Sequence, residues 1–196
     1  MAHDPRLPDD VTGMLDGTTD LLAELSRWAA TARADDAAAS RARERWLRQQ
    51  AVEEATLLGV LVDLAERATP VVVYTTSERR HRGIVRAVGV DFAALRSHAG
   101  RDVLIAVDAV STVRPEARGE PPLGDREIGL DLRLVEALAA LVADRPRLFI
   151  VTRGAKEGLR GDLLAVGQDV LTLRLDGEPR ATVYVPVAAV AEVSLV

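Results

Sequence analysis

The sequence has no cysteine, and only 3% of its 196 residues are aromatic. The absence of thiols excludes disulfides, thiolate zinc sites, iron–sulfur clusters and a cysteine nucleophile. The scarcity of aromatic side chains leaves few rings on which bases could stack. The longest apolar runs are about eight residues, well short of the roughly 20 that a membrane-spanning helix needs. Because the N-terminus is polar and acidic, unlike a signal peptide, we expect a cytoplasmic protein without membrane contact.

Hydrophobic residues make up 48% of the chain, enough for a substantial core, and the formal net charge is −5. This balance excludes a strongly basic protein that coats nucleic acid. The charge is unevenly distributed, however. Residues 70–118 carry eight basic and five acidic side chains, whereas residues 1–69 carry eight and thirteen. We therefore expect any contact with a polyanion to involve residues 70–118.

An internal repeat organises the second part of the chain. Residues 83–96 (GIVRAVGVDFAALR) align with residues 161–174 (GDLLAVGQDVLTLR), and seven of the 14 positions are identical. Composition alone would give about one or two identities, so the repeat is a duplication. The alignment extends in both directions, and the small changes in length fall in predicted loops.

Each copy reads as a helix followed by five short strands, because its segments alternate or are rich in β-branched residues and are separated by polar or glycine turns. The predicted strands are 71–76, 84–88, 92–96, 103–107 and 110–113 in the first copy, and 148–152, 159–166, 170–175, 182–187 and 189–195 in the second. Five short strands behind one helix predict a small, partly open β-barrel in each copy.

Before the first copy, two apolar helical patterns flank Asp35 and Asp36, which predicts an N-terminal helical hairpin. The second helix of this hairpin would run from about residue 37 to 67. Trp28 and Trp46 lie at similar distances from the turn, so we expect them to anchor the hairpin or a dimer interface. Between the copies, residues 114–129 hold three prolines and three glycines without a hydrophobic period, which predicts a linker or surface loop.

The predicted fold class is therefore α+β, with an N-terminal helical hairpin and two tandem five-stranded barrels, each preceded by a helix. The corresponding boundaries are residues 1–54 for the tail and hairpin, 55–114 for the first barrel, 115–130 for the linker and 131–196 for the second barrel.

The repeat unit resembles the Sm-like (LSm, Hfq-like) family of small β-barrels over about 45 residues per copy. The residues that carry this resemblance in the first copy are Pro70 to Tyr74, Gly83, Asp91 with Phe92, Leu95, and Val110 to Val113. The resemblance implies RNA binding, and it implies assembly by pairing of the fourth strand of one barrel with the fifth strand of the next. The two copies would then pair within one chain, with Val110 and Val190 at interfaces, and a ring of three chains would supply six barrels.

For RNA, the sequence offers a basic cluster at the first hairpin and one aromatic residue that matches the family's stacking position. The candidate residues are Arg79, Arg80, Arg82, Arg86 and Phe92. The Tyr-Lys-His motif of the Hfq-like proteins is replaced here by Ala106, Val107 and Asp108, so the basic half of that pocket is missing. A second basic cluster, residues 41–48, reads as a solvated face of the long helix.

The sequence contains no phosphate-binding loop, nucleophile elbow or dinucleotide fingerprint, and no catalytic constellation. The three histidines, His3, His81 and His98, have no partners at metal-binding spacing. We therefore expect a non-enzymatic protein without metal or cofactor. Two hypotheses remain. The first is a module whose barrels bind single-stranded RNA weakly or act in RNA-linked regulation. The second is an assembly module whose barrels have lost RNA binding while the N-terminal helices contact protein partners and drive homo-oligomerisation.

Overall fold

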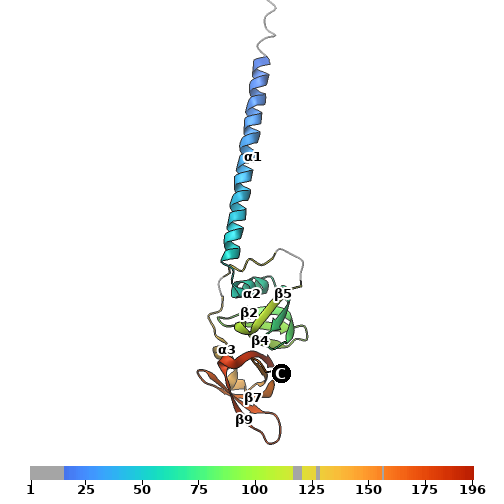
Figure 1. Ribbon diagram of the computed structural model, residues 1–196, viewed down its shortest axis with the longest axis vertical. Coiled ribbons are helices and arrows are strands. Elements are labelled where there is room, and N and C mark those ends of the chain that lie inside the picture. Colours follow the sequence, from blue (N-terminus) through green and yellow to red (C-terminus); the bar gives the residue numbers. More distant parts are fainter. Residues whose placement is uncertain (1–15, 117–120, 127–128, 156) are drawn as a thin grey trace, which may run out of the picture. The chain divides into compact units, whose positions relative to one another are not determined.

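The computed structural model describes residues 16–116, 121–126, 129–155 and 157–196. The protein is α+β, with a long N-terminal helix and a large antiparallel sheet (Figure 1). The chain divides into two compact units, residues 1–50 and 51–196, each described here by itself. Among the helices in the described ranges, none combines the length and the apolar character needed to cross a membrane.

The first unit is built on helix α1 (Asp16–Glu53), which is continuous, so the predicted hairpin is wrong. Asp35 and Asp36 lie inside the helix and do not break it. An aspartate in a helix interior costs only about 0.7 kcal/mol relative to alanine, and alanines on both sides favour the helix. Residues 16–53 contain no proline, and their single glycine lies at the N-terminal end of α1. Nothing in this segment therefore forces a turn.

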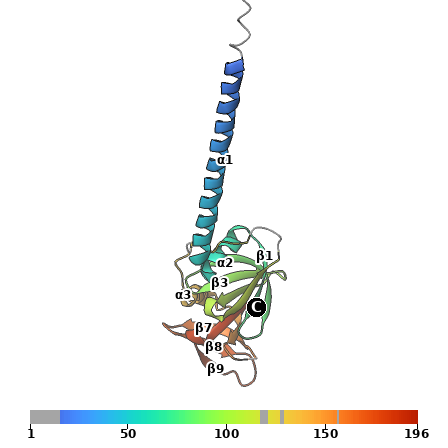
Figure 2. The ribbon, with the colours of Figure 1, turned by 45° about the horizontal axis from the view of Figure 1, so that its top comes forward.

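The second unit contains the duplicated elements (Figure 2). Its first half comprises α2 (Leu57–Glu66), β1 (Pro70–Thr75), β2 (Arg80–Val88), β3 (Phe92–Ser97), β4 (Asp102–Ala106), the 3₁₀ turn η2 (Val107–Ala109) and β5 (Val110–Pro115). Its second half comprises α3 (Leu134–Leu141), η3 (Val142–Asp144), β6 (Arg147–Thr152), β7 (Leu159–Val166), β8 (Val170–Leu175), β9 (Thr182–Pro186), η4 (Val187–Ala189) and β10 (Val190–Leu195). All ten predicted strands are present, and only β2 begins well before its predicted start.

The ten strands form one antiparallel sheet in the order β5-β1-β2-β3-β4-β10-β6-β7-β8-β9. Each half has the same internal order, with its fifth strand beside its first. The halves join through β4 and β10, where Glu192 pairs with Ile105, Val193 with Leu104 and Ser194 with Val103. The predicted pairing of a fourth strand with a fifth strand within the chain is thus confirmed. The two copies form one continuous sheet instead of two separate barrels, because this ladder merges them.

The segment predicted as one helix from about residue 37 to 67 is divided in the structure. Its first part belongs to α1, which ends at Glu53, and α2 starts separately after Thr56. The Thr56 hydroxyl caps α2 by accepting the Gly59 N–H at 2.9 Å, which satisfies a backbone donor at the helix start. The carboxylate of buried Asp63 accepts the N–H groups of Leu123 and Gly124 at 3.0 and 3.2 Å. Residues 121–126 of the predicted linker are therefore fastened to α2.

Two hydrophobic clusters form the core, and one of them crosses the junction between the halves. Phe92, Leu104 and Ala106 of the first half pack with residues of the second half such as Leu148 and Val193. The Leu134 N–H at the start of α3 donates to the Asp91 carboxylate at 2.7 Å. The Asp91 carboxylate thus binds the first half to the helix of the second.

β2 and β3 pack closely at Gly83. A Cβ atom at Gly83 would lie 2.1 Å from the backbone oxygen of Arg96, which cannot move aside without disturbing the ladder. We expect Gly83→Ala to lower the free energy of unfolding by about 2 kcal/mol, the usual scale of overpacking, in urea denaturation. Gly129→Ala is the matched control, because open space surrounds that position and its change should be nearly neutral. Equal effects of the two substitutions would contradict the close packing.

Candidate functional site

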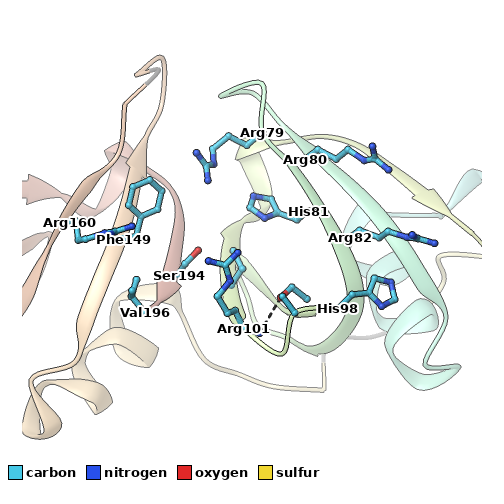
Figure 3. A pocket seen from close by; sticks show the side chains of 13 residues that line it. Arg79, Arg80, His81, Arg82, His98, Arg101, Phe149, Arg160, Ser194 and Val196 are labelled. Atoms are coloured by element: carbon cyan, nitrogen blue, oxygen red, sulfur yellow. Dashed lines mark hydrogen bonds between the residues drawn. The ribbon is translucent and has the colours of Figure 1, made fainter.

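A cleft of about 390 Å³ lies where the two halves meet (Figure 3). Its lining combines β2 and the loop after β3 with residues of β6, β7 and β10. The lining residues are Arg79, Arg80, His81, Arg82, Ser97, His98, Ala99, Arg101, Val103, Phe149, Arg160, Ser194 and Val196. Five arginines and two histidines make this surface strongly basic, although the whole chain is acidic.

A buried carboxylate organises one wall of the cleft. The Glu192 side chain of β10 is 0% exposed. Its oxygens lie 2.5 Å from Arg79 Nε and 2.6 Å from His81 Nε2. A carboxylate removed from water in this way requires charged or hydrogen-bonding partners, and both come from the other half of the sheet. Glu192 therefore fixes the first hairpin against β10.

The aromatic component of the site is Phe149 of β6. The Arg79 guanidinium carbon lies 5.1 Å from the centre of the Phe149 ring, and that of Arg160 lies 5.8 Å away. Both separations are within the range of cation–π attraction. Gly158 permits this placement, because a Cβ atom there would lie 2.2 Å from the ring. One guanidinium group from each half therefore lies within cation–π distance of the ring.

The remaining arginines of the cleft differ in their partners. The Arg82 Nε donates to Glu116 at 2.6 Å. This side-chain hydrogen bond is the main cause that holds the pKa of Glu116 below its usual 4.5, and the charges of Arg82 and Arg114 lower it further. Within the described ranges, Arg80, Arg101 and Arg160 form no ion pair with a carboxylate. Their charges therefore remain available to an anionic ligand.

Figure 3 shows the basic side chains in two groups. Arg79, His81 and Arg101 lie on the side of the first half that faces Phe149 and Ser194. Arg80 and Arg82 extend from the opposite side of β2, as alternation along a strand requires. The interior of the cleft therefore presents Arg101 and Arg160, and Arg80 lies at its rim.

The structure thus brings Arg79, Arg80 and Arg82 to one cleft, but it does not bring Arg86 or Phe92 there. Arg86 lines a separate, mostly apolar cleft of about 300 Å³ beside α2. Phe92 is 2% exposed and belongs to the junction core, so its predicted role in base stacking is wrong. The aromatic side chain near the arginines is Phe149, which only the pairing of the two copies identifies.

The four predicted interface residues lie in different surroundings. Trp28 and Trp46 are 73% and 63% exposed on α1 and cannot meet within the chain, because one continuous helix carries both. Val190 is fully buried in the cluster that crosses the junction. Val110 begins β5 and packs partly against the other cluster.

Comparisons with known proteins add no identification: neither the family models, nor the curated proteins, nor the solved structures contain a match to this chain. Among the described residues, no group of three or more histidine, aspartate or glutamate side chains is placed to hold a metal ion. The geometry of the basic cleft is therefore the basis for the function proposed below.

The buried ion pair predicts a large effect on stability. We expect Glu192→Gln to lower the free energy of unfolding by about 3 kcal/mol, because Arg79 and His81 would lose their carboxylate while remaining partly buried. Asp102→Asn is the control, since its pair with Arg96 is exposed and should contribute less than about 1 kcal/mol. Urea denaturation would measure both changes. A Glu192 effect as small as that of Asp102 would show that the ion pair does not hold the halves together.

Proposed function

We propose that the second unit is a non-enzymatic module that binds single-stranded RNA in the basic cleft. The observation that carries this proposal is the convergence of arginines without carboxylate partners beside one aromatic ring. Arg101 comes from the first half, whereas Arg160 and Phe149 come from the second. The site exists only because β4 and β10 join the halves.

In the proposed mode of binding, arginines contact the phosphates of the RNA and an aromatic ring contacts a base. Arg101 and Arg160 would contact phosphates in the interior of the cleft, and Arg80 would contact a phosphate at the rim. Phe149 would support a base, since base–aromatic stacking tolerates any sequence. A volume of about 390 Å³ suits one nucleotide at a time, within the usual range of ligand pockets. The RNA would then cross the junction as a single strand and not as a duplex.

The same proposal includes an Sm-like origin for the two halves. Three features support it: a helix precedes five strands in each half, both halves share one strand order, and the fourth strand of one half pairs with the fifth of the other. The family's own basic pocket residues are replaced here, so the RNA site proposed for this chain lies at the junction and not at the loop after the fourth strand.

Fluorescence anisotropy with labelled A-rich and U-rich RNAs at about 50 and 200 mM salt tests the site. We expect wild-type protein to bind in the micromolar range or more tightly, and the triple variant R80A/R101A/R160A to bind at least tenfold more weakly. Its salt dependence should fall by about 2 units of slope, because each phosphate contact to a single strand contributes about 0.7. The control R41A/R43A/R45A removes the same charge from α1 and should bind like wild type.

Phe149→Leu separates stacking from charge. This variant should lose about fivefold or more in affinity without a change in salt slope, since one stacked base contributes about 1–3 kcal/mol. Absence of wild-type binding at about 50 mM salt would overturn the RNA proposal. An equal loss in the two triple variants would also overturn it, because it would show that only net charge matters.

A second candidate function, assembly into a ring, is favoured by the unequal exposure of equivalent strands. β4 and β10 are mostly buried where they pair with each other. Their counterparts in the other half, β9 and β5, form the two ends of the sheet and are mostly exposed. Exposed strand edges invite pairing with another chain. We therefore propose that β9 of one chain pairs with β5 of a second copy.

The register of this outer contact, meaning which residues of β9 and β5 lie opposite each other, can be inferred from the pairing of β4 with β10. The repeat offset of 80 residues relates β4 to β9 and β5 to β10. Transferring the pair of Val193 with Leu104 gives Val113 of one copy opposite Tyr184 of the next. Tyr184 is 70% exposed on the free edge. A head-to-tail contact that repeats the internal geometry forms a ring where its rotation closes, and three chains would then supply six repeat units.

The ring predicts a measurable mass. Light scattering should give a particle that contains three chains or a multiple of three. The variant V113K/Y184K places two lysines opposite each other at the outer contact and should lose this threefold increase. The control A99K/Q168K adds the same charge at exposed positions away from the strand edges and should assemble like wild type. A wild-type protein that remains a single chain at every concentration would rule out assembly through these edges.

A further inference from the structure

Helix α1 carries exposed large apolar side chains for which the RNA site and the strand edges give no role. Trp28 and Trp46 are the largest, and Leu21 and Leu25 are also more than half exposed. The two tryptophans are separated by 18 residues, which is five turns of 3.6 residues, so they project from the same face about 27 Å apart. Exposed tryptophans aligned in this way indicate a contact surface.

The segment between the tryptophans suits close contact with another helix. Ala32, Ala39 and Ala42 occupy this face at spacings of three, four and seven residues, and their small side chains allow a second backbone to approach. Asp35 lies on the same face near the middle of the helix. One polar residue in an otherwise apolar stripe favours a single register at some cost in stability.

The spacing of these residues is symmetric about Ala37. Consider a second α1 that runs in the opposite direction, related by a twofold axis at the level of Ala37 along the helix. This arrangement places Trp28 of one copy opposite Trp46 of the other. Ala32 then lies opposite Ala42, so large side chains meet at both ends and small ones between them. This match needs only one sequence, as a symmetric contact between identical chains requires.

The charge distribution selects this antiparallel direction. Residues 16–36 contain five acidic and two basic side chains, whereas residues 37–53 contain two acidic and four basic ones. An antiparallel copy brings the acidic half of each helix beside the basic half of the other. A parallel copy would place like charges together along the whole length, which disfavours it.

We propose that α1 is a dimerisation helix that pairs in antiparallel orientation with α1 of a second copy, through the stripe that contains Trp28, Ala32, Ala39, Ala42 and Trp46. The inference depends on α1 alone and goes beyond both functions proposed above. It adds a twofold contact in the first unit to the head-to-tail contact proposed for the second unit.

Because the chain has no cysteine, engineered cysteines can test the orientation in the full-length protein. Chains that carry Ala32→Cys are mixed with chains that carry Ala42→Cys, allowed to exchange, oxidised and analysed on a non-reducing gel. We expect a covalent dimer in the mixture and none with either variant alone. In the antiparallel pair, identical positions lie ten residues apart, about 15 Å, and a disulfide needs Cα atoms within about 7 Å.

The same test in the V113K/Y184K background keeps α1 pairing distinct from ring assembly, because the crosslink should persist there. W28E/W46E should abolish the dimer in light scattering, whereas A30E/A37E, with the same charge change on the opposite face of α1, should retain it. Circular dichroism checks that both variants keep their helix content. A crosslink with Ala32→Cys alone would show a parallel pair, and a dimer unaffected by W28E/W46E would show that the stripe is not the contact; either result overturns the proposal.

Discussion

The ladder between β4 and β10 is the interaction on which the rest of the second unit depends. It joins two copies of one motif into a continuous sheet, and the core of the second half takes Phe92, Leu104 and Ala106 from the first. The second half therefore has no complete core without the first, whereas the other cluster lies entirely within the first half. The basic cleft follows from the same ladder, because four of its arginines come from the first half and Arg160 and Phe149 come from the second.

The buried carboxylate of Glu192 explains why the arginines of the first hairpin are not equivalent. Removing a carboxylate from water is unfavourable unless charged partners compensate it, so Arg79 and His81 are committed to the fold. Side chains alternate along a strand, which directs Arg80 to the other side. Of the four consecutive basic residues, Arg79 and His81 thus hold the structure, Arg82 pairs with Glu116, and Arg80 can meet a ligand. Charge counts along the sequence cannot make this distinction.

Local patterns predicted the strands well because alternation, glycine turns and the duplicated segment all act over a few residues. The ends of the helices were harder to predict. Two aspartates suggest a break that the alanine-rich surroundings of α1 override, and the Thr56 hydroxyl caps a separate helix inside the predicted span 37–67. Phe92 was predicted to stack on a base, but it is buried, since its neighbours across the junction lie far away in sequence. Phe149 could not be identified for the same reason, because Arg79 approaches its ring only when the halves are joined.

Duplication placed the same kind of strand edge at the middle and at the ends of the sheet, but the residues at these edges differ. The repeat offset puts Thr112 at the position of Glu192, and Leu159 at the position of His81. The proposed outer contact would therefore form without burying a charge, and it would lack the ion pairs that fix the inner one. Its strength would come mainly from backbone hydrogen bonds and from Tyr184. The inner junction joins two halves of one polypeptide, whereas the outer contact would join separate chains. The cleft can therefore persist in a single chain, while assembly would depend on protein concentration.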